Sequence, residues 1–254
     1  GAGHVGATTA QRIAEAGLIG IVISNSPATV AHPGMTRKLF GTNPFAYAVP
    51  GLGRDVTTNW KVSGGHIAER CGLFVIIALG ETLLISGATF AGMAWDGAGL
   101  AAFLGSVGIS IAMWWVYFHV GHRRATHQIE HSDDPGRIAR LSFTYAHIPV
   151  VAGVVLAAVG SERAIAHPGD IGTVGDMAVL IGGNAVFLAG NGWFKRLSSE
   201  WFPLSHYVGI GLCAALAVAG LFVPIWLSCV AGAASLVLVA AWEHLSLSRA
   251  GKLA

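Results

Sequence analysis

Long apolar stretches dominate the pattern of the chain beyond residue 70. They lie at 72–93, 98–120, 138–160, 176–194, 204–223 and 224–242. Each is long enough, or nearly so, to cross the hydrocarbon core of a bilayer, which needs about 20 residues of helix. The last two meet so closely, around Val223 and Pro224, that they indicate a helical hairpin or one broken helix. The pattern predicts an all-α polytopic membrane bundle of about six transmembrane helices.

The first 50 residues follow a different pattern. A short helical pattern ends at Gly17, an apolar run follows at 18–23, and the next stretch is rich in Ser, Asn and Pro. A run this short fits a strand and cannot span a bilayer. We therefore predict a small, incomplete α/β-like segment at 1–50 and a transmembrane domain at 51–254. The sequence starts without Met and shows no signal-peptide pattern, so we expect an incomplete or processed chain.

The composition supports the membrane class and excludes others. Hydrophobic residues make up 54% of the chain and charged residues only 11%, and the mean hydropathy is +0.62. A typical soluble domain has about 25% charged residues. A net charge of +2 does not indicate a nucleic-acid partner. Cys71, Cys213 and Cys229 are far apart in apolar surroundings, which is typical of neither a disulfide framework nor a metal site.

The basic residues beyond position 50 are distributed asymmetrically when the chain crosses the membrane six times. Only Arg163 falls on one side. The other side carries Arg54, Lys61, Arg70, Arg123, Arg124, Arg137, Arg140, Lys195, Arg196, Arg249 and Lys252. Because short cytoplasmic loops are enriched in Lys and Arg, we predict that the basic side is cytoplasmic. Both ends of the segment 51–254 are then expected in the cytoplasm.

One acidic residue, Glu81, lies in the middle of the first span, within FVIIALGETLLISGATF. A carboxylate at the bilayer centre costs roughly 2.5–3.5 kcal/mol on insertion scales. Arg70 cannot pair with it on the same helix, because their positions are about 16 Å apart. We expect Glu81 to face the bundle interior and to find a partner on another helix, a water-filled cavity or a proton. The competing interpretation is a neutral, structural Glu81.

Further polar residues are candidates for an intramembrane pathway with Glu81. His147 lies just before Pro149, whose ring removes a backbone hydrogen bond and can open the helix locally. Asn184 and Asn191 are seven residues apart and share one face of the fourth span. Together, these residues form our predicted polar intramembrane site. The alternatives are a packing role for His147 and helix–helix hydrogen bonds for the two asparagines.

His66, Glu69 and Arg70 form a second polar motif, at the cytoplasmic end of the first span. Snorkelling and contact with lipid headgroups explain this motif as well as a functional role does. Glu243 and His244 close the last span, and we assign both residues to the membrane interface.

The histidines of HVGHRRATHQIEHSDD are candidates for metal binding. They are His119, His122, His127 and His131. Two of them are four residues apart, which is compatible with zinc on a helix. The stretch follows a span and contains two arginines, so we favour a solvated cytoplasmic loop. We predict no metal and no cofactor.

Residues 1–50 carry a family resemblance. GAGHVG matches the G-x-G-x-x-G pattern of dinucleotide-binding turns, although no strand precedes it. GLIGIVISNSPATVAHPG and LFGTNPFAYAVP are more specific, and they resemble type-2 malate/lactate dehydrogenases, which are NAD(P)-dependent oxidoreductases. The resemblance implies that His4 corresponds to an active-site histidine and that Gly41, Thr42 and Asn43 belong to a cofactor-side loop. Because only about fifty residues of that fold are present, we expect a remnant.

Residues 51–254 carry a second resemblance, in HIAERCGLFVIIALGE, WWVYFHVG and YAHIPVVAGVVLAAVGSERAIAHPGD. These stretches resemble the bacterial low temperature requirement protein A family. The resemblance implies a multi-pass protein of the bacterial inner (plasma) membrane whose biochemical activity is not established. We expect the lipid bilayer as one partner. Because family members are longer, we expect as a further partner either a missing N-terminal membrane half or a second copy of the chain.

Three functions follow from these observations. The leading hypothesis is proton-linked transport of a small solute through a polar site around Glu81. The second is a non-catalytic membrane component that supports growth in the cold. The third is an NAD(P)-dependent oxidoreductase contributed by residues 1–50.

Overall fold

The structure is a computed structural model of the 254-residue chain, and it describes residues 9, 12–13, 20–23, 45–48, 64–93, 95–119, 139–199 and 203–249. The chain forms two units, Gly1–Trp60 and Lys61–Ala254. In the first unit, strand β1 (Gly20–Ile23) pairs antiparallel with strand β2 (Phe45–Ala48). The predicted strand in the run 18–23 is therefore present.

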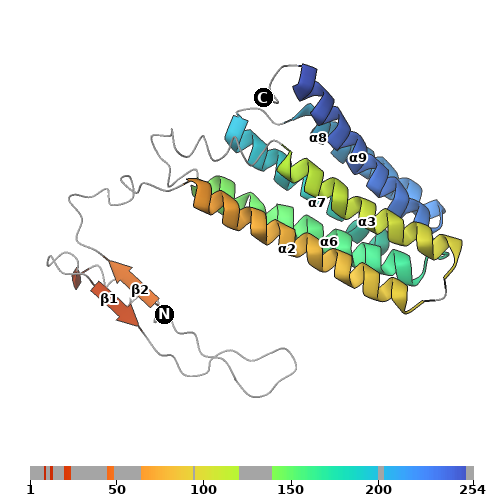
Figure 1. The fold of residues 1–254 in the computed structure, drawn as a ribbon, viewed down its shortest axis with the longest axis horizontal. Coiled ribbons are helices and arrows are strands. Elements are labelled where there is room, and N and C mark those ends of the chain that lie inside the picture. The colour runs from red at the N-terminus through yellow and green to blue at the C-terminus, as the bar shows by residue number, and fades with distance from the viewer. Residues whose placement is uncertain are drawn as a thin grey trace, which may run out of the picture. The chain divides into compact units, whose positions relative to one another are not determined.

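Within the described part of the second unit, six helices are long and apolar enough to cross a membrane, which confirms the predicted polytopic bundle (Figure 1). They are α2 (Gly64–Ala91), α3 (Gly97–Phe118), α6 (His147–Ala166), α7 (Val174–Ser199), α8 (Leu204–Ala219) and α9 (Ile225–Arg249). A π-helical segment, η1 (Ala139–Tyr145), precedes α6, and a short 3₁₀ helix, η2 (Gly220–Phe222), follows α8.

The turn between α8 and α9 decides between the two predicted arrangements of the last spans. Val223 ends η2 in an extended conformation, and α9 starts two residues later. Pro224 pairs with Ile171 in an isolated bridge, and the Ile225 amide donates to the Asp170 carbonyl over 2.9 Å. The two helices therefore form a hairpin, which is tied at its tip to the loop between α6 and α7.

Glycines allow α6 and α7 to pack backbone against backbone. A Cβ atom at Gly153 would overlap the backbone of Phe187, and one at Gly160 would overlap the backbone of Leu180. Small residues at such positions are typical of membrane bundles, in which close packing holds the helices together. This pair of helices forms the centre of the bundle, and it fixes the position of the polar side chains on α7.

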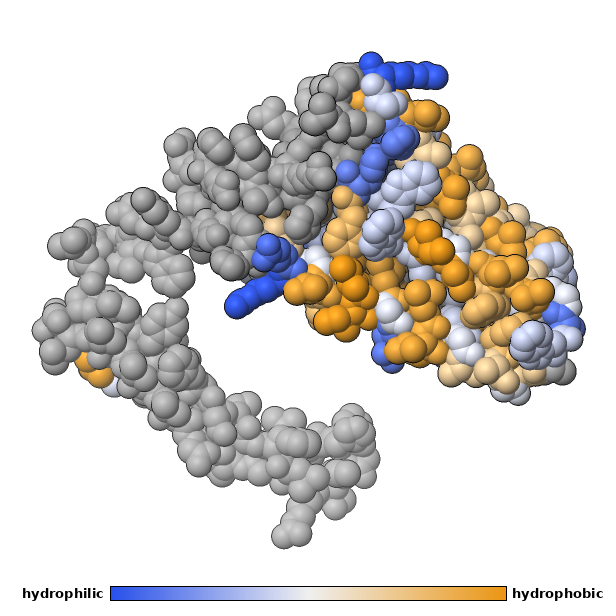
Figure 2. Space-filling model, in the orientation of Figure 1, coloured by the Kyte–Doolittle hydropathy of each residue, from blue (hydrophilic) through white to orange (hydrophobic). Residues whose placement is uncertain are grey.

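The outer surface of the bundle is strongly apolar. Figure 2 shows orange, apolar side chains over much of the visible face of the helical unit. Large apolar side chains on α2 are exposed, including Phe74, Ile77 and Leu84. Such a surface suits a lipid environment, in which helices satisfy their own backbone hydrogen bonds. The chain is a multi-pass membrane protein surrounded by a lipid bilayer.

Candidate functional site

A row of polar side chains lies on the inner face of α7. Asn184, Asn191 and Lys195 are separated by seven and then four residues, so they share one helix face over about 17 Å. The two asparagines are fully buried, and Lys195 is only 4% exposed. We call these three residues the α7 polar row. It runs from the middle of α7 toward the end of the bundle at which α3 and α9 also end.

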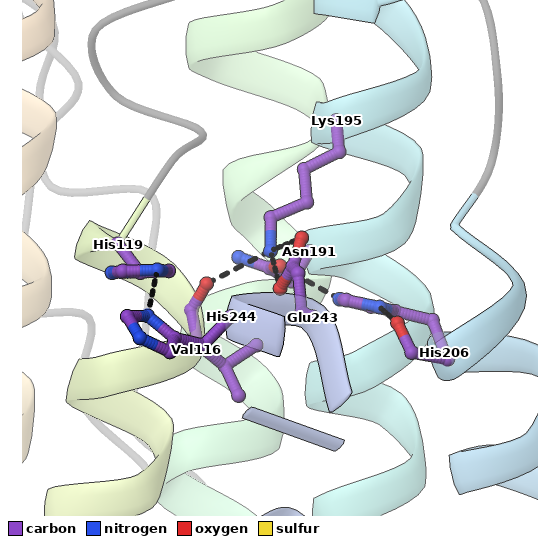
Figure 3. Close-up of polar contacts among 8 residues, drawn as sticks. Val116, His119, Asn191, Lys195, His206, Glu243 and His244 are labelled. Carbon is purple, nitrogen blue, oxygen red and sulfur yellow. Dashed lines mark hydrogen bonds and ion pairs between the residues drawn. The ribbon is translucent and has the colours of Figure 1, made fainter. Parts of the chain in front are cut away.

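Lys195 forms a buried ion pair with Glu243 of α9 (Figure 3). Its Nζ atom donates to Oε1 over 2.8 Å and to Oε2 over 2.6 Å. A third hydrogen bond, of 2.9 Å, goes to the carbonyl of Val116. Glu243 is 8% exposed, so both charges are largely removed from solvent. The ammonium group has three N–H donors, and each of them finds an acceptor here.

The third acceptor of Lys195 has a local cause. Val116 lies in the last turn of α3, where backbone carbonyls have no partner within the helix. A cation at this end also interacts favourably with the helix dipole. Lys195 therefore neutralises Glu243 and caps α3 at once, so that α3, α7 and α9 are held together at one point.

His206 of α8 extends the site on the other side of α7. Its Nε2 atom donates to the Oδ1 atom of Asn191 over 2.9 Å, and its Nδ1 atom accepts from the Ser205 hydroxyl over 3.2 Å. His206 is fully buried. In Figure 3 the Lys195 side chain reaches Glu243 from above, and the His206 ring lies to the right of Asn191. The site thus combines side chains from α7, α8 and α9.

Asn184 occupies the inner end of the α7 polar row. Its amide nitrogen lies 2.9 Å from the position that a Cβ atom of Gly232 would take, so the side chain abuts the backbone of α9. Neither its Nδ2 atom nor its Oδ1 atom has a hydrogen-bond partner in the described part of the chain. Leaving buried polar groups unpaired costs about 1–3 kcal/mol each. Asn184 thus offers one donor group and one acceptor in the middle of the bundle.

Two further histidines meet beside the ion pair. The Nδ1 atom of His244 and the Nε2 atom of His119 are 2.8 Å apart, so one ring must donate and the other accept. Burial and then the neighbouring His244 lower the pKa of His119. Lys195 acts in the same direction, and Glu243 opposes it. The neutral form of His119 is therefore favoured at this end of the bundle.

His147, from the predicted site, lies in a separate aromatic pocket. Its Nδ1 atom donates to the Ser142 carbonyl over 2.8 Å, and its Nε2 atom accepts from the Tyr117 hydroxyl over 2.7 Å. The rings of Phe143 and Phe194 flank it, with centroids 5.8 and 4.9 Å away. The π-helical turn η1 brings the Ser142 carbonyl within reach of the ring. These contacts are those of a packed imidazole.

Glu81 lies elsewhere in the structure. It sits on the exposed face of α2, between Ile77 and Leu84, and makes no hydrogen bond or ion pair within the described residues. The expectation that this face points into the bundle differs from the structure, because α2 buries its opposite face, which includes Val75 and Leu79. Glu81 is therefore not brought together with His147 or with the α7 polar row. Its role in function stays a prediction.

The remaining predicted residues fall outside the site or outside the described part of the chain. Glu69 and Arg70 are exposed near the start of α2. The side chain of His66 lies outside the described residues. The same holds for His4, Gly41, Thr42, Asn43, His122, His127 and His131.

Sequence reasoning missed Lys195, Glu243 and His206 as members of one site. Lys195 follows Asn191 by four residues, so the spacing that linked the two asparagines also reaches the lysine. The lysine was interpreted only as a marker of topology, because basic residues at the end of a span usually indicate the cytoplasmic side. Glu243, which is expected at the level of the membrane interface, lies buried beside α7. No pattern in the sequence linked His206 to Asn191.

Comparisons with known proteins give two partial relatives. The chain is 38% identical over 202 residues to the "Uncharacterized protein RA0937" of Rhizobium meliloti, and the match covers 79% of this chain and 49% of that protein. It is 42% identical over 57 residues to a (2R)-3-sulfolactate dehydrogenase (NADP(+)) of Chromohalobacter salexigens, covering 22% of this chain and 17% of the enzyme. No solved structure matches.

The chain spans about half the length of the first of these relatives, and a much smaller part of the second. A family-level comparison covers more of the sequence. The sequence model of the bacterial low temperature requirement A protein family matches residues 6–241, a range that includes all of the α7 polar row and the described helices up to Ala241. The chain belongs to the bacterial low temperature requirement A protein family.

Proposed function

We propose that the protein moves protons together with a small polar solute across the bacterial inner membrane, by way of the α7 polar row. The observation that carries this proposal is the Lys195–Glu243 ion pair, which is buried at one end of the α7 polar row. The row leads to the amide of Asn184, which has no partner among the described residues. Ionisable residues inside membrane bundles are rare and mark ion or substrate pathways by default. The Asn184 amide supplies the donor and the acceptor that a small polar solute needs.

The ion pair is the element that couples the two movements. While Glu243 is ionised, it holds Lys195 and closes the end of the row between α7 and α9. A proton that binds to Glu243 turns the carboxylate into a neutral acid, removes the charge attraction and frees the ammonium group from one partner. Asn191 and His206 lie next to this point and give the released groups alternative hydrogen-bond partners.

The test is proton movement in vesicles that contain the purified full chain and an entrapped pH-sensitive dye. A potassium diffusion potential drives protons inward, and the external medium is screened with small polar solutes. We expect proton uptake above that of empty vesicles, increased by the transported solute and reduced at least tenfold in Glu243→Gln. Uptake equal to that of empty vesicles under every solute, or unchanged by Glu243→Gln, would refute the proposal.

Glu81 is tested in the same assay, because it is an acid in the middle of a span. Our proposal for this residue is that its carboxyl group accepts a proton from within the membrane. Glu81→Gln should then lower proton uptake independently of Glu243→Gln. Uptake that is unchanged by Glu81→Gln removes this residue from the pathway and leaves the α7 polar row as the route.

The orientation of the chain is also a proposal. The end of the bundle that carries Lys195, Arg196 and Arg249 is expected in the cytoplasm, because basic residues are enriched on that side. The orientation is measured with single cysteines placed at exposed positions of either end. They are labelled in intact cells by a membrane-impermeant maleimide. Labelling at the basic end before lysis would contradict the orientation.

A non-catalytic membrane component is the second candidate function. This function is favoured because each N–H donor of Lys195 already has an acceptor, which leaves no donor of this group for a solute. In this case, the Glu243→Gln variant should restore growth in the cold as well as the parent does, provided that it folds. The oxidoreductase hypothesis is weaker, because the matching enzyme is covered over only 17% of its length, and binding of a nicotinamide cofactor by the purified chain tests it.

A further inference from the structure

A groove of about 730 Å³ lies between α8 and α9 on the outside of the bundle. Val208 and Leu212 line it from α8, and Leu238 and Leu245 line it from α9. The groove exists because the two helices meet closely at Gly209, where a Cβ atom would come within 2.6 Å of the Val239 side chain. The glycine forms the floor, and the larger side chains on each side form the walls.

The groove has the length and position of a lipid chain in one leaflet. On α9, its lining extends from Ser235 to Arg249, which is about 21 Å along the helix. On α8, it extends from Leu212 back to Ser205, which is about 10 Å. One leaflet of the hydrocarbon core is about 15 Å thick, half of the full 30 Å. The groove therefore runs from the middle of the bilayer to one surface.

Its outer end is polar and basic. Arg249 lines the groove at the last residue of α9, where it is exposed, and Ser205 and Ser246 line the same end. Trp242 stands among them, and tryptophan is enriched at the level of lipid headgroups. Among the described residues, no acidic side chain lines the groove. The polar end thus presents the positive charge of Arg249 and the exposed hydroxyl group of Ser246, a set suited to a phosphate group.

We propose that this groove is a binding site for an anionic phospholipid, with an acyl chain between α8 and α9 and the headgroup phosphate on Arg249. The apolar walls alone would accept any lipid chain, so the charge at the outer end determines the preference. A zwitterionic headgroup brings its own cation to Arg249 and gains less from it. The apolar length of the groove favours a lipid over free phosphate. The proposal does not depend on the transport function.

The test is native mass spectrometry of the full chain, purified in detergent and given equal amounts of phosphatidylglycerol and phosphatidylcholine with identical acyl chains. We expect the parent to bind phosphatidylglycerol in preference. Arg249→Gln should reduce that preference about fivefold, the factor that corresponds to about 1 kcal/mol for one basic residue near an anionic surface. Arg196→Gln is the matched control, because Arg196 is exposed at the same end of the bundle but does not line the groove. It should keep the preference of the parent.

A second variant tests whether the lipid chain occupies the groove. Ala241→Phe places a ring in the groove from α9 and should reduce binding of both lipids. The proposal is overturned by any of three results: an unchanged preference in Arg249→Gln, an equal loss in Arg196→Gln, or unchanged phosphatidylglycerol binding in Ala241→Phe. Loss of a dimer in Ala241→Phe without loss of lipid would assign the groove to a second copy of the chain and would also overturn it.

Discussion

Replacing Lys195 with methionine should strongly destabilise the bundle. The substitution keeps most of the volume of the side chain and removes its charge. Glu243 is then left as a carboxylate that is 8% exposed and has lost both of its hydrogen bonds to the ammonium group. The carbonyl of Val116 loses its partner at the end of α3 at the same time. We expect the variant to lose charge pairing and helix capping together.

The magnitude follows from the burial of the pair. Removal of one partner from a buried ion pair costs about 3–5 kcal/mol, because the other charge remains without compensation. Replacement of both partners by apolar residues is often nearly neutral, so Lys195→Met combined with Glu243→Leu should recover most of the loss. The pair of Arg163 and Asp170 is the control, since these side chains are 35% and 55% exposed. Asp170→Asn, which removes only this exposed pair, should cost less than about 1 kcal/mol.

These free energies are measured by unfolding the purified protein with sodium dodecyl sulfate in mixed micelles. Loss of the helical circular dichroism signal reports the unfolding. The four proteins of the cycle are the parent, Lys195→Met, Glu243→Leu and the double variant. A cost below about 1 kcal/mol for Lys195→Met would refute the reasoning, because the ion pair would then not be buried. Costs of the single variants that simply add in the double variant would show that the two residues do not interact.

Three further measurements test other parts of the bundle. Gly153→Ala should destabilise the bundle by about 1–3 kcal/mol, because the new methyl group overlaps the backbone of α7. Gly80→Ala should not destabilise it, because no described atom lies within 4 Å of the position of the new methyl group. Equal effects of the two substitutions in the same unfolding assay would contradict the packing of α6 on α7. Tyr117→Phe should cost about 1–3 kcal/mol, because the buried Nε2 atom of His147 loses its donor, and a loss below about 0.5 kcal/mol would argue against this bond. Because the pKa of His119 is lowered in the folded protein, the unfolded chain binds more protons as the pH falls through about 6.5, so acidification should lower the melting temperature. His119→Gln should make that fall smaller, and an identical fall in parent and variant would rule His119 out as its cause.

The six spans were predictable from the sequence because the length of an apolar run reports directly on the thickness of the bilayer. The ends of the helices were less predictable. Helix α2 begins at Gly64, before the predicted start at 72, and α9 continues to Arg249, past the predicted end at 242. Hydropathy marks where a chain leaves the hydrocarbon core, and a helix continues beyond that point when its backbone hydrogen bonds do.

The site was predictable only where one helix contains the information. Asn184 and Asn191 share a face by their spacing, and the structure places both in the interior. Lys195 pairs with a residue 48 positions away, and the periodicity of one helix cannot identify a partner on another. The same limit explains Glu81, since the pattern of α2 defines its faces but not which of them meets the neighbouring helices.

The buried ion pair also gives the bundle a dependence on temperature. Hydration of charged groups has a strongly negative entropy, so it becomes more favourable as the temperature falls. Cooling therefore increases the free-energy cost of keeping Lys195 and Glu243 away from water, while warming reduces it. The ion pair therefore stabilises the contact between α3, α7 and α9 least at low temperature, because hydration of the two separated charges is most favourable there.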